Sequence, residues 1–170
     1  VLTAAHVVQE DSNPTVEFST ASRPFLPGEV MSGAELHDEL MGLALVKVRG
    51  SIPSGLTPLM LAMPTTKVGT GQSISVLGYP KAAEGNFDVV RGDMFSSRGR
   101  RIKLNIVLDE GASGAPVLKD HVVVGLVQSV KGRYVSGNSG ASLKTFVDGY
   151  DEVVTEPPRQ PAEKIVGTDN

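Results

Sequence analysis

The apolar residues of this 170-residue chain fall into short runs, each bounded by glycine, proline, asparagine or serine. Such runs predict short β-strands joined by turns. Residues 73–77 and 102–106 alternate apolar with polar side chains, as expected where one face of a sheet is buried. The chain has 19 glycines and 11 prolines but only 5 Phe, 3 Tyr and no Trp, which disfavours a helical bundle. We therefore expect an all-β fold with strands within residues 15–18, 43–48, 73–77, 87–90, 101–108 and 121–127.

The strand-rich sequence divides into two halves at a proline-containing stretch, residues 56–64. We expect a first domain over 1–60, a second over 61–150, and an extended tail over 151–170 in which three prolines occur within five residues. Residues 122–127 are apolar at every position, which predicts a strand covered on both faces. A chain of this length can bury one core or two small cores that share an interface.

Composition excludes several classes of function. The net charge is −3, and the longest basic cluster is Arg98-Gly99-Arg100-Arg101, so we expect no nucleic-acid partner. No apolar run is long enough to span a membrane. The chain lacks cysteine, which rules out disulfides and thiolate metal sites and leaves the compartment open. Because it begins with Val1 rather than Met, we expect the sequence to begin inside a longer chain or after processing, and the question of additional domains beyond either end stays open.

Three segments contain candidate chemistry: Thr-Ala-Ala-His at 3–6, Gly-Leu-Ala-Leu-Val-Lys-Val at 42–48, and Gly-Ala-Ser-Gly-Ala-Pro-Val-Leu at 111–118. A nucleophilic serine needs a base, and imidazole is the usual one because its pKa lies near neutrality. The α/β-hydrolase order requires a histidine after the serine, and the only one is His121, eight residues beyond Ser113. The subtilisin order requires an aspartate before His6, and there is none. The remaining order is histidine, acid, serine.

These three segments resemble, in order and spacing, the signature segments of trypsin-like serine peptidases, and most closely those of the cysteine-free bacterial members such as the Htr/Deg type. The resemblance covers about residues 1–150. It implies two six-stranded antiparallel β-barrels with the active site between them, the first barrel being incomplete at its N-terminus. It also implies His6 as general base, Ser113 as nucleophile, and the main-chain N–H groups of Gly111 and Ser113 as oxyanion donors. The implied substrate is a polypeptide, and no cofactor or metal is implied.

The sequence departs from the family where the catalytic acid should stand, because Gly42 occupies the position of the usual aspartate. Loss of that carboxylate's function lowers turnover by ~10⁴ in a well-studied serine protease. Asp38 is the nearest substitute, on the condition that residues 38–42 form a loop from which its carboxylate can reach His6. The rival hypothesis is a catalytically impaired member of the family that binds peptides or proteins, and an unrelated all-β binding domain is a third.

The resemblance also implies a specificity pocket formed by Val107, Gln128, Ser129 and Val130. Val107 stands where trypsins have an acid, so we expect a small or medium apolar substrate side chain rather than Lys or Arg. A second serine, Ser139, lies in Gly-Asn-Ser-Gly-Ala at 137–141, which also resembles a nucleophile loop. Because no proline and apolar pair follows it, we interpret this segment as a hairpin or a wall of the pocket.

Overall fold

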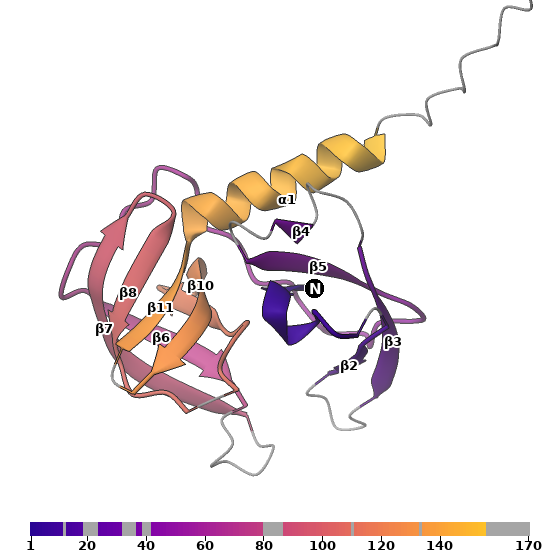
Figure 1. Ribbon diagram of the computed structural model, residues 1–170, viewed down its shortest axis with the longest axis horizontal. Helices are drawn as coiled ribbons and strands as arrows, with labels where there is room; N and C mark the ends of the chain where they lie inside the picture. The colour runs from indigo at the N-terminus through magenta and orange to yellow at the C-terminus, as the bar shows by residue number, and fades with distance from the viewer. Residues whose placement is uncertain are drawn as a thin grey trace, which may run out of the picture.

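The computed structural model describes residues 1–11, 13–18, 24–31, 37–38, 42–79, 87–109, 111–132 and 134–155. Two β-structures lie side by side, a closed barrel and a smaller curled sheet, and one long helix extends from the barrel over the sheet (Figure 1). The fold is therefore mostly β, which confirms the predicted class. Within the described residues, no helix combines the length and apolarity needed to cross a membrane.

The second half of the chain forms a closed six-stranded antiparallel barrel in the order β10-β11-β8-β7-β6-β9. Its strands are β6 (Ser73–Gly78), β7 (Asp88–Arg98), β8 (Arg101–Asn105), β9 (Pro116–Lys119), β10 (Val122–Lys131) and β11 (Tyr134–Ser139). The predicted alternation is clearest in β8, where Ile102 and Leu104 are buried and their neighbours are exposed. These side chains fill the barrel together with Val76, Met94, Val117, Val127 and Val135.

The first half forms a five-stranded sheet in the order β1-β5-β3-β2, with β4 also paired to β5. Its strands are β1 (Leu2–Ala4), β2 (Thr15–Glu17), β3 (Phe25–Val30), β4 (His37–Asp38) and β5 (Leu43–Val48). The prediction for residues 43–48 matches β5 at both ends. The Val1 ammonium donates to the Val46 carbonyl oxygen at 2.7 Å, and burial lowers the pKa of this amine. The sheet curls as a half-barrel, and with the closed barrel it makes a chymotrypsin-like double barrel.

Strand β10 is the wall that the two halves share. Val124 and Val127 face the interior of the closed barrel, whereas Val123 and Leu126 belong to a second core between the halves. Both pairs are buried, so the prediction that residues 122–127 are covered on both faces is confirmed. The second core is completed by residues from the first sheet and the helix: Ala4, Leu43, Leu143 and Phe146.

The connection between the halves is largely exposed, but it contacts β10 at residues 60–62. Residues 49–72 form no strand, apart from a single parallel bridge that joins Leu61 to Val123. The Ala62 N–H donates to the Val123 carbonyl at 2.9 Å, and the Val123 N–H donates to the Met60 carbonyl at 2.8 Å. Part of the stretch predicted as the connection, residues 56–64, is thus fixed to the shared strand.

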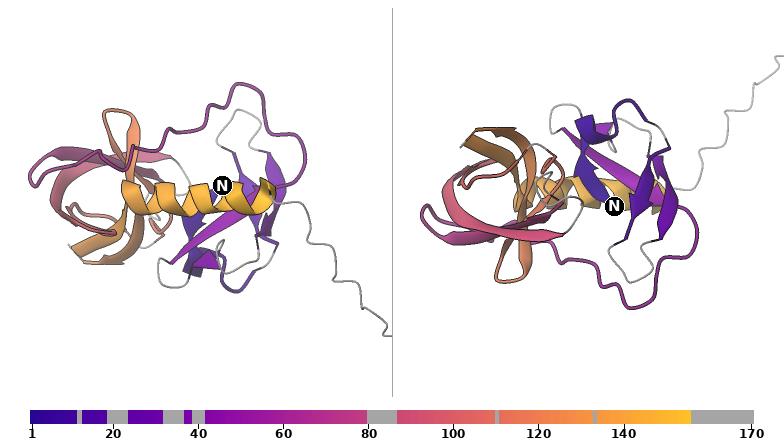
Figure 2. Two further views of the ribbon diagram at one scale, coloured as in Figure 1. Left: turned by 90° about the horizontal axis from the view of Figure 1, so that it is seen from above. Right: turned by 90° about the horizontal axis from the view of Figure 1, so that it is seen from below.

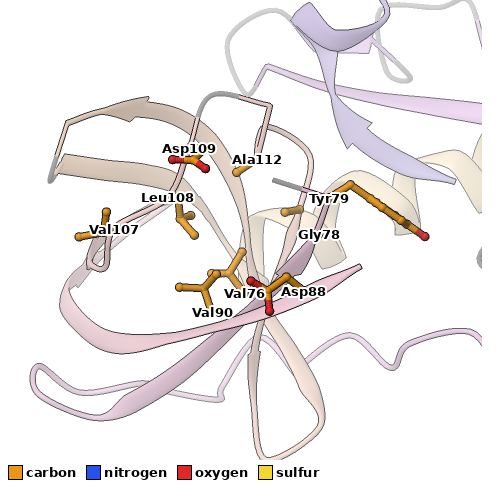
Figure 3. Close-up of a pocket in the computed structure, with 10 residues that line it drawn as sticks. Val76, Gly78, Tyr79, Asp88, Val90, Val107, Leu108, Asp109 and Ala112 are labelled. Carbon is orange, nitrogen blue, oxygen red and sulfur yellow. The ribbon is translucent and has the colours of Figure 1, made fainter. Parts of the chain in front are cut away.

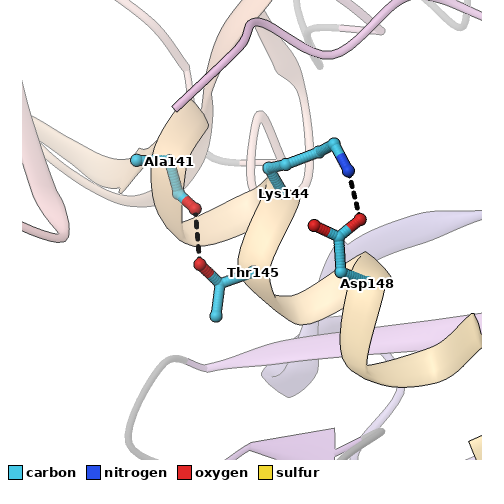
Figure 4. Close-up of polar contacts among 4 residues, drawn as sticks. All are labelled: Ala141, Lys144, Thr145 and Asp148. Atoms are coloured by element: carbon cyan, nitrogen blue, oxygen red, sulfur yellow. Dashed lines mark hydrogen bonds and ion pairs between the residues drawn. The ribbon is translucent and has the colours of Figure 1, made fainter. Parts of the chain in front are cut away.

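The sequence patterns predicted no helix, so they missed α1 (Gly140–Thr155), and they also missed strands β1, β3, β4 and β9. Helix α1 extends beyond residue 150, where we expected the second domain to end, and lies over both halves (Figure 2). Leu143 and Phe146, one turn apart, face the second core. Its other side is polar: the Thr145 hydroxyl donates to the Ala141 carbonyl at 3.0 Å, and Lys144 pairs with Asp148 (Figure 4). Residues 156–170 of the expected tail lie outside the described residues.

Candidate active site

His6 lies in a single 3₁₀ turn, η1 (Ala5–Val7), directly after β1. The main-chain N–H of Ala5 donates to the Gly42 carbonyl at 2.7 Å, so this turn is anchored to the segment that precedes β5. The His6 side chain is exposed. The base predicted from the sequence therefore stands at the end of a strand, open to an incoming group.

Ser113 lies in a loop made of two consecutive turns. The Ala112 N–H donates to the Asp109 carbonyl at 3.3 Å, and the Ala115 N–H donates to the Ala112 carbonyl at 3.0 Å. The loop reverses sharply because Gly111 and Gly114 adopt φ values of 100° and 86°, which side-chain-bearing residues rarely reach. Among the residues that the structure describes, the main-chain N–H groups of Gly111 and Ser113 donate to no acceptor.

The loop that holds Ser113 packs against the strand that leads into His6. A Cβ placed on Gly114 would lie 2.4 Å from Thr3 Oγ1 and 3.5 Å from the Ala4 nitrogen, so only glycine fits at this distance. The Gly114 N–H also donates to the Val127 carbonyl at 2.8 Å, which fixes the loop to β10. The two segments singled out in the sequence, 107 residues apart, thus meet where the halves of the molecule join.

The Ser113 hydroxyl is directed to a main-chain acceptor. It donates to the Gln128 carbonyl at 3.4 Å, well above the usual 2.7–2.8 Å of a hydroxyl–oxygen bond, so this hydrogen bond is weak. Within the described part of the chain, no hydrogen bond joins the His6 ring to this hydroxyl. The serine and histidine are on adjoining segments without a direct bond between them.

Beside Gly42, where the sequence resemblance led us to expect a missing acid, the structure places the side chain of Gln128. Gly42 has φ +67°, and its carbonyl accepts a hydrogen bond from Gln128 Nε2 at 2.8 Å. A Cβ on Gly42 would lie 3.1 Å from Gln128 Oε1. Sequence reasoning assigned Gln128 to the specificity pocket and did not connect it with Gly42, which is 86 residues away. The one feature of the sequence that could have indicated a special role for Gln128 is its place as a polar residue directly after the buried run 122–127.

Asp38 lies in β4, and its backbone pairs with Leu43 of β5. Leu43 pairs on its other edge with Ala4 of β1. Because strands in a sheet are ~4.8 Å apart, the backbones of Asp38 and Ala4 are roughly 10 Å apart, with β5 between them. We expected Asp38 to lie in a loop over residues 38–42, but its backbone belongs to strand β4. Residues 39–41 and the Asp38 side chain lie outside the described part of the chain.

In the described part of the chain, the four residues predicted for the specificity pocket have different surroundings. Val107 is largely exposed and lines a cavity of about 220 Å³ beside the Ser113 loop, together with Val76, Gly78, Tyr79, Asp88, Val90, Leu108, Asp109, Ala112 and Ala115 (Figure 3). Ser129 lines a separate groove with Phe95 and Tyr134. Val130 packs against the barrel core, and the Gln128 side chain is bonded to Gly42. Among the described residues, no group of three or more His, Asp or Glu side chains could hold a metal ion.

The sequence profile of the trypsin-like peptidase domain matches residues 1–126, a range that includes both His6 and Ser113. The chain belongs to the trypsin-like peptidase family. A search of curated proteins gave no match to this trypsin-like domain. Among solved structures, it is similar to a crystal structure of Rv3671c from M. tuberculosis H37Rv, described as an inactive form of a serine-to-alanine mutant. The TM-score is 0.68 at 21% identity, over 92% of this chain and 78% of that chain, which is a likeness of fold.

Proposed function

We propose that this chain is a serine endopeptidase that hydrolyses peptide bonds through an acyl-enzyme. His6 removes the proton of Ser113 as the serine Oγ attacks the substrate carbonyl carbon, and it returns that proton to the leaving amine. A water molecule, deprotonated by His6 in turn, then attacks the acyl group and releases Ser113. The substrate is a polypeptide, and no cofactor takes part in these steps.

The observation on which this proposal chiefly rests is the contact of the Ser113 loop with β1. Gly114 lies so close to Thr3 and Ala4 that any side chain at position 114 would collide with them. His6 follows Ala4 by two residues, within the turn that Gly42 anchors. The bond from the Ser113 hydroxyl to the Gln128 carbonyl is long and weak, so we expect the hydroxyl to leave it readily to donate to His6.

The proposed oxyanion donors are supported by the main chain of the same loop. The N–H groups of Gly111 and Ser113 have no acceptor among the described residues, as a site that waits for substrate oxygen requires. Preorganised donors of this kind stabilise the developing oxyanion by ~3–4 kcal/mol each. Ala112, where the family often has Asp or Asn, is compatible with this role because both donors are main-chain groups.

For substrate recognition, we propose that the cavity beside Val107 accepts a small or medium apolar side chain. Most of its lining is apolar, and Val76, Val90 and Leu108 supply aliphatic surface. The segment from Gln128 to Val130 would border the bound polypeptide along β10. The absence of cysteine from the sequence agrees with a place among the cysteine-free bacterial members of the family, such as the Htr/Deg type.

A second candidate function is a catalytically silent domain that binds peptides or proteins. Gly42 in the position of the acid favours it, as does the Ser113 hydroxyl being bonded to the Gln128 carbonyl. In this alternative, the domain would bind polypeptides at the junction of its halves without reacting with them.

Covalent labelling with a fluorophosphonate separates the two functions. We expect the wild-type chain to become labelled at Ser113, and the variants Ser113→Ala and His6→Ala to lose labelling by at least 100-fold, because both the nucleophile and its base are required. Ser54→Ala, at an exposed turn serine, is the matched control and should label as the wild type does. A wild-type chain that is folded by circular dichroism and stays unlabelled would instead support the silent binding domain.

A further inference from the structure

We propose that Gln128 is a positioning residue that holds the His6 turn and the Ser113 loop in register across the junction of the two halves. The inference rests on the proposed peptidase function and assigns to Gln128 a role other than the substrate contact expected from the sequence. It starts from the position of Gln128 in β10, where the pairing with β11 shifts register between Val127 and Ser129. A residue at such a bulge is released from the regular ladder, and its side chain is redirected.

The side chain of Gln128 bonds to a carbonyl next to the first sheet that also accepts a main-chain hydrogen bond. Gly42 O accepts one hydrogen bond from Gln128 Nε2 at 2.8 Å and another from the Ala5 N–H at 2.7 Å. Ala5 directly precedes His6, so the amide of Gln128 is connected to the histidine turn through one shared acceptor. Both bonds are short and are at least partly removed from water, and such bonds fix geometry well.

The main chain of Gln128 contacts the nucleophile at the same time. Its carbonyl accepts the Ser113 hydroxyl at 3.4 Å, and the preceding carbonyl, of Val127, accepts the Gly114 N–H at 2.8 Å. One residue therefore joins both segments: the side chain is bonded to the segment of the base, and the carbonyl is bonded to the nucleophile. The hydroxyl is held loosely enough to move to His6, whereas the histidine turn is held firmly.

Gly42 makes this arrangement possible, because a side chain there would meet the amide. A Cβ would be only 3.1 Å from Gln128 Oε1, and the positive φ of +67° favours glycine as well. The absence of the usual acid and the presence of the glutamine bond thus occur at the same point. We infer that the peptidase maintains the position of its base with this neutral amide bond.

The test compares Gln128→Met with Gln72→Met. Methionine keeps the length and flexibility of glutamine without its donor. Gln72 is a matched control because its Oε1 accepts the Gly69 N–H at 2.9 Å, a bond of similar length in an exposed turn of the barrel. Loss of the Gln128 amide leaves the Gly42 carbonyl bonded to Ala5, so Gln128→Met is expected to fold.

We expect Gln128→Met to lower kcat by roughly 10- to 100-fold, the range produced when a catalytic group is displaced by up to about 1 Å. KM should change less than threefold, because the side chain faces the first sheet, and Gln72→Met should match the wild type in both constants. The fluorophosphonate labelling rate of Ser113 should fall in parallel with kcat at an unchanged labelled fraction. If only the labelled fraction falls while the labelling rate stays the same, Gln128 has a structural role and the proposal is overturned. An unchanged kcat would also overturn it.

A second measurement does not depend on the variant. In the wild-type chain, the side-chain amide protons of Gln128 should exchange with solvent more slowly than those of Gln72 by nuclear magnetic resonance, since the bond to Gly42 O is partly buried. Equal exchange would overturn the proposal on its own. If the wild type does not label at Ser113, the peptidase function fails, and the positioning role fails with it. A labelled wild type with an unaffected Gln128→Met contradicts only the role of Gln128.

Discussion

Gly42 is the residue at which we expect the chemistry of this domain to depart most from its family. Its φ of +67° and the Gln128 amide beside it both disfavour a side chain, so the structure is adapted to glycine at this point. Aspartate is nevertheless among the side chains that tolerate left-handed backbone best, since its carboxylate can bond to nearby main-chain groups. A substitution can therefore test whether the family's usual acid can be restored.

We predict that Gly42→Asp raises kcat. Asp38→Asn tests the other candidate acid, because it lowers kcat only if the Asp38 carboxylate reaches His6. The gain should stay well below the ~10⁴ attributed to the acid elsewhere, because the new Cβ displaces the Gln128 amide and the backbone strain costs about 1–2 kcal/mol. Steady-state hydrolysis of a peptide substrate measures both effects. An unchanged rate in Asp38→Asn excludes it as the acid, an outcome that the intervening strand β5 already favours.

Among the elements, α1 and the strand before it explain the second serine motif. Ser139 is the last residue of β11, and its Oγ accepts a hydrogen bond from the Ser142 N–H at 3.4 Å, the position typical of a helix N-cap. The same Oγ donates to the Gly99 carbonyl at 3.0 Å. Residues 137–139 therefore lie in the second strand of the β10–β11 hairpin, and residues 140–141 begin α1, so the glycine and serine content reflects a hairpin strand that turns into a helix.

We predict that Ser139→Ala destabilises the fold by about 1 kcal/mol through loss of the cap, without loss of labelling at Ser113. Urea unfolding followed by circular dichroism gives the free energy of unfolding, with Ser54→Ala as the exposed control. If a folded Ser139→Ala variant lost labelling while Ser113→Ala kept it, the nucleophile would be Ser139 and not Ser113.

The strands also show which sequence patterns correspond to paired structure. The runs at 43–48 and 73–77 are good predictors because their apolar residues are both buried and paired. Alternation at 101–108 predicted too long a strand: β8 ends at Asn105, yet Ile106 and Leu108 are buried and Val107 is exposed. The pattern therefore reports burial at the end of the barrel, not pairing. Conversely, β7 continues to Arg98 through polar residues because its main chain pairs with β8, and side chains do not reveal that.

The candidate site was predictable only as far as its local motifs. Chain order and motif resemblance led to His6 and Ser113, and the structure places their segments against each other through Gly114 and Thr3. The bond between Gln128 and Gly42 could not be predicted, since it joins residues 86 positions apart through a strand bulge. Helix α1 was missed because its glycines, Gly140 and Gly149, and its small polar residues obscure the apolar spacing of Leu143 and Phe146.

At the scale of the whole molecule, the two halves are held together by one core to which the first sheet, β10 and α1 all contribute. Leu143 is fully buried there. We predict that Leu143→Ala lowers the free energy of unfolding by about 2–5 kcal/mol, through lost apolar contact and the cavity left behind. Thr145→Ala, on the exposed side of the same helix, should change it by less than about 1 kcal/mol. Denaturant unfolding measures both, and equal effects would mean that α1 does not stabilise the junction.

Strand β10 presents alternate faces to two separate cores, with Val124 and Val127 on one side and Val123 and Leu126 on the other. Inserting or deleting a single residue just before Val123 would, unless a bulge absorbed the change, turn these side chains to the opposite faces. Each of the two cores would then receive the side chains that now pack in the other core, and the Gln128 side chain would point away from Gly42. Changes of length are therefore far less tolerable in β10 than substitutions of one aliphatic residue by another.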